Sequence, residues 1–305
     1  MKPHTFLCIL LSFGVLCIES TSGDTFELPK ADRPATPFQM EEVTIGGQTR
    51  YRILTEHYDI TAAQAEDGKR VGERLEHLAN VWTLLLAEFV KEEKDKPASH
   101  RHRIILYRDK QEYTLNLRRF DSRIAETNGF YYEPNKTAYF FSMEEKILLH
   151  EGTHQILAEH FAREKLSMYR NNFWIVEGIA LFMQTLKVED KHYKVGDILA
   201  DRLFSAKVYR LEQNHHLPIR QLTAMNRTRF QNRSGADLQR MYSQSATLVH
   251  WLMFAEEGRY RGALFELLRQ TYLDAAKPES LSELTGLSYE ELDKKYAEFL
   301  KVIPE

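Results

Sequence analysis

The chain has 305 residues, with 41 Lys and Arg against 44 Asp and Glu and a formal net charge of −3 at pH 7. A charge this close to zero argues against a protein dedicated to nucleic-acid binding. The length is sufficient to bury a hydrophobic core that folds without the help of disulfides.

The N-terminus has the order of a secretory signal peptide. Lys2 precedes an apolar stretch over residues 6–18, and a small polar run follows it. No later segment approaches the roughly 20 apolar residues of a membrane-spanning helix, so we expect a secreted or periplasmic protein without a membrane anchor. Both cysteines, Cys8 and Cys17, lie within residues 1–23. Cleavage would therefore leave no thiol for a disulfide, a nucleophile or a metal site.

Residues 24–40 are rich in Pro, Asp, Thr and Ala and lack periodicity, which predicts a flexible leader. We expect residues 41–302 to form one domain, with an α+β part over residues 41–190 and a mainly helical part over residues 191–302. Within the first part, two β-rich segments flank Gly46–Gly47 and predict a β-hairpin. Thr61 and Gln64 have the spacing of a capping box and predict that a helix begins there.

That helix is predicted from apolar residues three and four positions apart, which mark one buried face. These residues are Val71, Leu75, Leu78, Val81, Leu85 and Phe89. Residues 103–108 predict a strand, and residues 129–141 alternate aromatic and polar side chains around a turn, which predicts a hairpin or an edge strand. Helices are predicted from residue 142 and over residues 173–187, and the chain beyond residue 195 is predicted to be almost wholly helical.

The run His150-Glu151-Gly152-Thr153-His154 is an H-E-x-x-H motif within a predicted helix. Positions four apart lie on one face of a helix, so the imidazoles of His150 and His154 can approach the same metal ion. Glu151 follows the first histidine and is placed to act as a general base on water. Imidazole suits zinc, and a catalytic zinc site takes three protein ligands and keeps a fourth position open. The motif therefore predicts a single zinc ion.

Two residues compete to be the third ligand. Glu177 lies among apolar neighbours on the next predicted helix, where an unpaired carboxylate would be costly and a His, His, Glu site would explain it. His160 stands where the related signature H-E-x-x-H-x-x-G-x-x-H has its third histidine. That signature uses a glycine to leave the helix, but this sequence has Leu157 there, so a continuing helix carries His160 away from the metal face. We therefore expect Glu177.

Other residues could complete a hydrolytic site. Tyr242 and His250 lie on one predicted helix and are candidate donors to a developing oxyanion. We assign Tyr242 as a second catalytic residue, in addition to the general base Glu151. Helix packing explains Tyr242 and His250 equally well. An aromatic segment over residues 130–132 and 139–141 immediately precedes the motif helix. It could pair with an extended peptide by strand addition, or it could equally pack its rings into the core.

The two metal motifs resemble those of the gluzincins, which are zinc peptidases of the MA clan, and in particular an exported bacterial group with a peptidase-like domain of unknown function. The resemblance lies in the run His150 to Gln155 and in Trp174-x-x-Glu177-Gly178-x-Ala180. It extends over roughly residues 45–300 and implies a zincin-like fold, one zinc ion, and the roles given above to the three ligands and Glu151. Many gluzincins carry an acidic residue one turn after the third ligand, where it supports a zinc histidine. Leu181 stands there in this sequence, so a support must come from elsewhere.

The expected function is an exported zinc metallopeptidase that acts on a peptide or protein substrate, with Glu151 as the general base. No signature for binding a free amino terminus is recognisable, which favours an endopeptidase over an aminopeptidase. The alternative is a noncatalytic binding or scaffold protein that keeps the zincin-like fold. Glu151 argues against this alternative, because a purely structural metal site has no need of a base.

Overall fold

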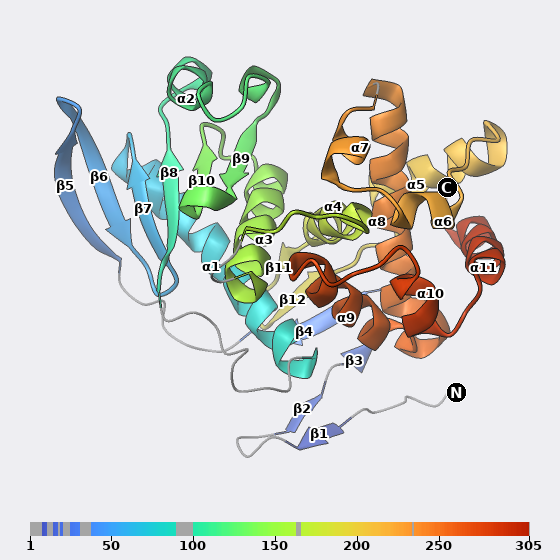
Figure 1. Ribbon diagram of the computed structural model, residues 1–305. Helices are drawn as coiled ribbons and strands as arrows, with labels where there is room; N and C mark the ends of the chain where they lie inside the picture. Colours follow the sequence, from blue (N-terminus) through green and yellow to red (C-terminus); the bar gives the residue numbers. More distant parts are fainter. Residues whose placement is uncertain are drawn as a thin grey trace.

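The computed structural model describes residues 8–10, 15–17, 19–20, 25–30, 38–89, 100–162, 166–233 and 235–304. Its architecture is α+β, as predicted. A six-stranded mixed sheet lies at one side, and the C-terminal helices lie at the other (Figure 1). Helices α3 (Glu145–Phe161) and α4 (Phe173–Met183) lie between them.

The large sheet has the strand order β5-β6-β7-β8-β10-β9. Its strands are β5 (Gln39–Ile45), β6 (Gln48–Leu54), β7 (Tyr58–Ala62), β8 (His102–Leu106), β9 (Gly129–Tyr132) and β10 (Thr137–Phe140). The pairs β7–β8 and β8–β10 are parallel and the remaining pairs are antiparallel. Strand β9 is therefore an edge strand that runs opposite to its neighbour. The predicted hairpin over residues 129–141 is confirmed.

Helices cover both faces of this sheet. On one face, α1 (Ala65–Phe89) and α3 pack against the strands and against each other. On the other face, α2 (Lys110–Leu117) and the short helix η2 (Ile124–Glu126) bury a small separate cluster. Because α3 lies beneath β10 and β9, its residues reach the edge of the sheet.

The hairpin between β5 and β6 turns at Gly46 and Gly47, as predicted. Their φ angles are 59° and 76°, in the left-handed region that glycine adopts without a steric penalty. The turn sets the register in which Ile45 pairs with Gln48.

Helix α1 buries the apolar face that its periodicity predicts. Val71, Leu75, Leu78, Val81 and Leu85 are all 0 % exposed. The predicted start of the helix is wrong, because it begins at Ala65 and Thr61 belongs to β7, where it pairs with Arg52. Pairing with a neighbouring strand has prevailed over the local capping signal.

A second, smaller sheet has the strand order β11-β12-β4-β3. Its strands are β3 (Glu19–Ser20), β4 (Phe26–Pro29), β11 (Lys187–Val188) and β12 (His192–Val195). Phe26 and Leu28 are buried, and the ring centroid of Phe26 lies 4.8 Å from that of Phe254. The expectation of a flexible leader is therefore wrong for residues 26–29, because their partner strand comes after α4.

Most of the expected signal peptide, residues 1–23, lies outside the described residues, as do residues 31–37 of the expected leader. The described parts of residues 1–23 are β3 and an antiparallel pair formed by β1 (Cys8–Leu10) and β2 (Val15–Cys17).

The chain after β12 is almost wholly helical, as predicted. Its elements are α5 (Asp201–Lys207), η4 (Val208–Glu212), α6 (Ile219–Thr223), α7 (Arg227–Gln231), α8 (Gly235–Gly258), α9 (Arg261–Tyr272), α10 (Ser280–Thr285) and α11 (Tyr289–Val302). The long helix α8 packs along α4 and joins the C-terminal half to the centre of the molecule. None of the helices within the described ranges is both long and apolar enough to span a membrane.

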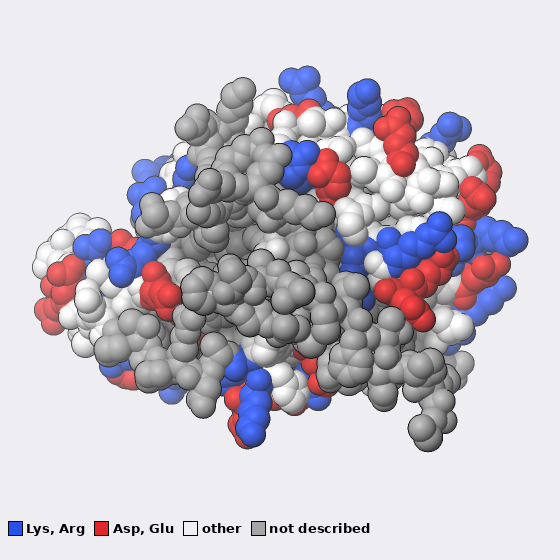
Figure 2. Space-filling view, turned by 90° about the horizontal axis from the view of Figure 1, so that it is seen from below, with Lys and Arg blue, Asp and Glu red and all other residues white. Residues whose placement is uncertain are grey.

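Charged side chains of both signs are mixed on the surface. Over the described part of the face in Figure 2, Lys and Arg lie among Asp and Glu. Ion pairs form between surface charges of opposite sign, such as Lys295 with Glu256 at 2.7 Å. Neighbouring charges therefore largely offset each other.

Candidate metal centre

Helices α3 and α4 bring the three predicted ligands together. His150 and His154 lie one turn apart on α3, and Glu177 lies on α4, which packs beside α3. The Nε2 atoms of the two histidines are 3.1 Å apart. Glu177 Oε2 lies 3.3 Å from His150 Nε2 and 3.7 Å from His154 Nε2. All three potential ligand atoms therefore surround one point.

These separations fit a metal ion placed between the three atoms. Zinc bonds of roughly 2.0–2.2 Å at tetrahedral angles put neighbouring ligand atoms about 3.3–3.6 Å apart. The observed values of 3.1, 3.3 and 3.7 Å lie around that range. A single hydrogen bond could join the two facing Nε2 atoms of neutral His150 and His154, whereas a metal ion would bind the lone pairs of both. The residues present thus fit a zinc ion.

The electrostatics of the site favour a cation. Glu177 is only 4 % exposed. Burial raises the pKa of its carboxyl, but the hydrogen bonds and charges of His150 and His154 outweigh burial and hold that pKa well below its usual range. Burial likewise lowers the pKa of His150, yet Glu177 and Glu151 together raise it. A buried anionic carboxylate with two imidazoles beside it is suited to holding a positive ion.

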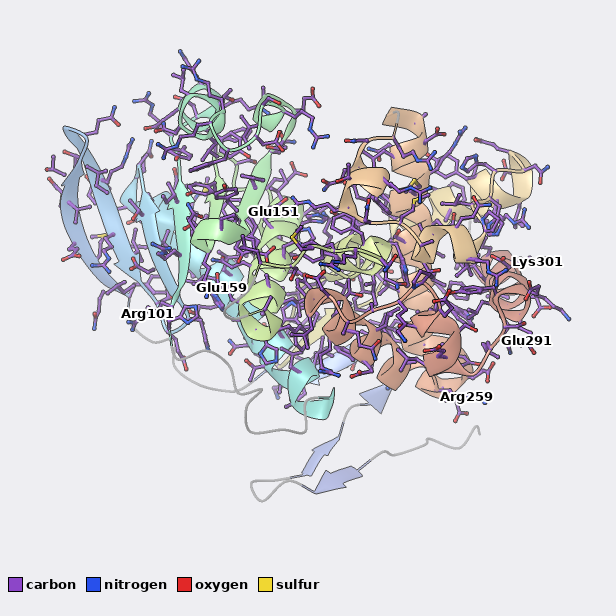
Figure 3. The ribbon with its side chains drawn as sticks, viewed as in Figure 1. Arg101, Glu151, Glu159, Arg259, Glu291 and Lys301 are labelled. Atoms are coloured by element: carbon purple, nitrogen blue, oxygen red, sulfur yellow. The ribbon has the colours of Figure 1, made fainter. Side chains whose placement is uncertain are left out.

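Glu151 is held at the junction between α3 and the edge of the sheet. Its Oε2 accepts a hydrogen bond from the backbone N–H of Tyr131 on β9, at 2.9 Å. Gly129 allows this close approach, because a Cβ atom there would lie 2.7 Å from Ile147 Cγ2 and 3.0 Å from Glu151 Cγ. Figure 3 shows Glu151 on α3 beside β9.

One cavity of about 320 Å³ contains the three ligands and Glu151 in its wall. This volume lies within the range of small-molecule and peptide side-chain sites. The wall is formed by the chain leading into β9, by β9 itself, and by α3, α4, α7 and α8. Its apolar and aromatic members include Phe130, Tyr131, Tyr169, Phe173, Val176 and Leu238. Charged side chains, among them Arg123, Glu133 and Arg227, also line it.

Tyr242 lines this cavity from α8. The charge of Glu177, together with burial, raises the pKa of Tyr242, so its phenol stays protonated and can donate a hydrogen bond. Its ring lies 5.6 Å from that of Phe230 and 5.9 Å from the guanidinium carbon of Arg202. Phe230 and Arg202 therefore both pack beside the ring of Tyr242.

His250, the other candidate donor on α8, does not line the cavity. It is 1 % exposed, and its Nε2 lies 3.2 Å from the carbonyl oxygen of Gly196. Its ring packs against Phe182, Phe254 and Phe299. The expectation for His250 is therefore wrong, because its face of α8 is turned into the core.

His160 is separate from the ligand group. Helix α3 continues through Leu157 to Phe161 without a break. His160 is 7 % exposed, and its ring lies edge-on against Phe161. Among the described residues, the third side chain that joins His150 and His154 is Glu177. The geometry therefore agrees with the preference for Glu177 over His160, which rested on Leu157 standing where the related signature has a glycine.

Gln184 supplies a polar contact to the ligand His150, which the apolar side chain of Leu181 cannot supply. Its side-chain amide nitrogen lies 3.3 Å from His150 Nδ1. Gln184 is the C-terminal cap of α4, directly after its last residue and seven positions after Glu177. The spacing Glu177, Leu181, Gln184 follows one face of a helix, and this signal could have identified the residue from sequence.

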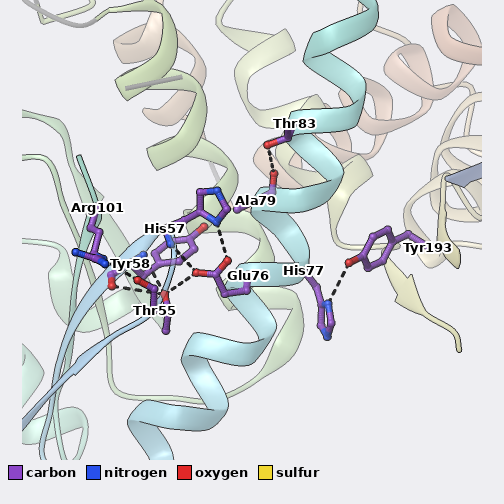
Figure 4. A network of polar contacts seen from close by, with 9 residues as sticks. All are labelled: Thr55, His57, Tyr58, Glu76, His77, Ala79, Thr83, Arg101 and Tyr193. Atoms are coloured by element: carbon purple, nitrogen blue, oxygen red, sulfur yellow. Dashed lines mark hydrogen bonds and ion pairs between the residues drawn. The ribbon is translucent and has the colours of Figure 1, made fainter. Parts of the chain in front are cut away.

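Two further groups of histidine and acidic side chains occur in the described part of the chain. Glu159 Oε2 lies 2.7 Å from His100 Nε2 and 2.9 Å from His102 Nδ1, and Glu76 Oε2 lies 2.7 Å from His57 Nδ1. These are direct hydrogen-bond lengths, shorter than an intervening ion allows. The Glu76 carboxylate is also hydrogen-bonded by the Thr55 hydroxyl and the His57 N–H (Figure 4). Both groups are hydrogen-bonded networks that join the sheet to helices.

Glu159, which lies further along α3 than Glu151 (Figure 3), should make stability depend on pH. Burial raises the pKa of Glu159, but hydrogen bonds with His102, His100 and Gln155 outweigh burial and lower it. The carboxylate therefore stabilises the fold above its unfolded pKa of about 4.3, and this contribution is lost as pH falls through the lower folded pKa. We expect Glu159→Gln to reduce the free energy of unfolding by about 1–3 kcal/mol at pH 7 and by progressively less below about pH 4.

Urea denaturation at a series of pH values measures this difference. Glu42→Gln, at an exposed position on β5, is the matched control and should change the free energy of unfolding little at any pH. A loss in Glu159→Gln that is the same at pH 3 and pH 7 would contradict the assignment.

Two sequence comparisons with known proteins found no relative. No protein-family model matches this chain. No curated protein is significantly similar to it in sequence. The functional interpretation therefore rests on the residues and their geometry.

Proposed function

We propose that the protein is a zinc-dependent hydrolase of the gluzincin type with a zincin-like fold. His150, His154 and Glu177 hold the metal, and Glu151 is the general base. The observation that carries this proposal is the arrangement of three ligand atoms 3.1–3.7 Å apart beside Glu151 in one cavity. When bound, zinc supplies a Lewis acid that makes water more acidic and polarises a substrate carbonyl.

The protein side chains then have separate tasks. Glu151 is anchored by one carboxylate oxygen to the N–H of Tyr131. Its carboxylate takes a proton from water and delivers it to the leaving group. Tyr242, whose raised pKa keeps it protonated, donates a hydrogen bond to the developing oxyanion from the α8 wall.

The substrate that we propose is a peptide or protein. Strand β9 is an edge strand and also borders the cavity, so an extended peptide can add to its outward main-chain groups other than the Tyr131 N–H, which already donates to Glu151. The aromatic wall, which includes Phe130 and Phe173, suits an apolar side chain of that peptide. Together with the signal-like N-terminus, these features support an exported metallopeptidase.

Metal analysis of the purified protein tests the proposal. We expect a single zinc ion per chain, which is lost or bound much more weakly in His154→Ala and Glu177→Ala but retained in His160→Ala. Peptide-library digestion followed by mass spectrometry should detect cleavage that a chelator abolishes and zinc restores. If correctly folded protein takes up no zinc even when zinc is supplied, the proposal of a zinc-dependent hydrolase is refuted and a noncatalytic binding protein is favoured.

A further inference from the structure

Gln184 lies behind the ligand histidines, away from the substrate side. It is half-buried, and its amide approaches His150 Nδ1, the ring nitrogen on the opposite side from Nε2. The cavity wall contains His150, His154 and Glu177, whereas Gln184 is outside that wall. A role in contacting substrate is therefore unsuitable for Gln184, and a role in orienting His150 follows from its position.

The contact must change whenever the proton of His150 moves between Nε2 and Nδ1. A metal at Nε2 requires the lone pair there, so the neutral ring of His150 carries its proton on Nδ1 and needs an acceptor. Without a metal, Nε2–H can donate to Glu177 Oε2, and Nδ1 then needs a donor. The two states of the ring thus make opposite demands on the same neighbour.

An amide can meet both demands. Its oxygen accepts and its nitrogen donates, and a half-turn of the group exchanges the two at nearly the same position. A carboxylate at this place could only accept, and would support only the metal-bound state. For His154 the situation differs, because its Nδ1 is buried and has no hydrogen-bond partner among the described residues.

We propose that Gln184 is a positioning residue that fixes the orientation and the proton tautomer of His150, and that its amide turns over when that proton moves between Nε2 and Nδ1. This inference rests on the proposed metal site. The amide orientation with nitrogen toward Nδ1 serves the tautomer that donates from Nε2, and the opposite orientation serves the metal-bound ring, whose proton is on Nδ1. Gln184 can therefore hydrogen-bond His150 Nδ1 in the metal-free protein, and it supports zinc binding when zinc is present.

Zinc affinity is the direct test, measured by competition with a chelating indicator. Gln184→Met keeps the length of the side chain but removes both hydrogen-bonding groups, and should weaken zinc binding about 10- to 100-fold. Gln184→Glu restores an acceptor and should bind zinc at least as tightly as the wild type, with slower zinc release. Gln221→Met, the same change at an exposed position on α6, is the matched control and should bind zinc like the wild type.

Nitrogen-15 spectra of the histidine rings supply a readout that does not depend on activity. In zinc-loaded wild type, the proton of His150 should be on Nδ1. Thermal unfolding in the presence of a chelator should show that all variants fold. Wild-type affinity in Gln184→Met, or equal weakening in Gln184→Met and Gln184→Glu, would overturn the inference while leaving the metal site intact. Failure of the wild type itself to bind zinc would refute the proposed function and this inference with it.

Discussion

Glu151→Gln should abolish hydrolysis while zinc stays bound. The glutamine oxygen can still accept the hydrogen bond from the N–H of Tyr131, which lies 2.9 Å from the native carboxylate. The amide cannot take a proton from water, however, and loss of a general base typically costs 10²- to 10⁴-fold in rate. We therefore expect kcat/KM to fall by about that factor, with zinc content and thermal stability like those of the wild type.

Comparison with a neighbouring glutamate isolates the effect of the base. Glu144 is exposed just before α3, so Glu144→Gln makes the same chemical change at the start of the same helix. Its kcat/KM should equal that of the wild type. Full activity in Glu151→Gln would show that Glu151 is not the general base. The hydrolase would then use a different base or no protein base.

Gly178→Ala should destabilise the protein and weaken its metal site together. A Cβ atom at Gly178 would lie 2.7 Å from the backbone oxygen of Ser245 and 2.8 Å from Val249 Cγ2, both on α8. A backbone oxygen cannot turn aside, so α4 and α8 would have to separate. Overpacking of this kind costs about 1–3 kcal/mol, and the contact with backbone favours the upper end. Because Glu177 is the preceding residue, we also expect weaker zinc binding.

Gly262→Ala is the matched control for this prediction. Apart from its chain neighbours and the backbone of its own helix α9, no described atom lies within 4 Å of a Cβ atom built at Gly262. Alanine there should leave the free energy of unfolding unchanged or raise it slightly, because it restricts the unfolded chain. Chemical denaturation and zinc titration of both variants check the expectation. Equal stability of Gly178→Ala and the wild type would show that α4 and α8 are not held as close as described.

Local sequence patterns predicted the parts of the fold that depend on local interactions. The two glycines between β5 and β6 required a turn with positive φ, and the buried face of α1 repeated at helical spacing. The ligand arrangement was also predictable in part. The spacing of His150 and His154 follows from helix geometry alone, and the absence of glycine at Leu157 disfavoured His160.

The features that were not predicted depend on contacts between residues far apart in the sequence. Local periodicity carries no information about such contacts. Residues 26–29 resembled a leader because their strand partner β12 follows α4. The side of α8 that faces the cavity could not be deduced from its pattern, since Tyr242 lines the cavity and His250 lies in the core. The glycines of the two metal motifs have a similar explanation. Gly152 faces Leu75 and Leu78 of α1, and Gly178 faces α8, so packing between helices requires them.

The short edge strand β9 has a consequence for substrate selection. It contains four residues and is followed at once by η3 (Glu133–Asn135), which includes Pro134. Proline has no N–H to donate, so main-chain pairing along this edge ends there. At roughly 3.3 Å per residue, the strand is about 13 Å long, and the Tyr131 N–H within it already donates to Glu151. The enzyme that we propose would therefore read a window of a few residues around the cleaved bond, and longer substrates would gain little affinity from their additional length.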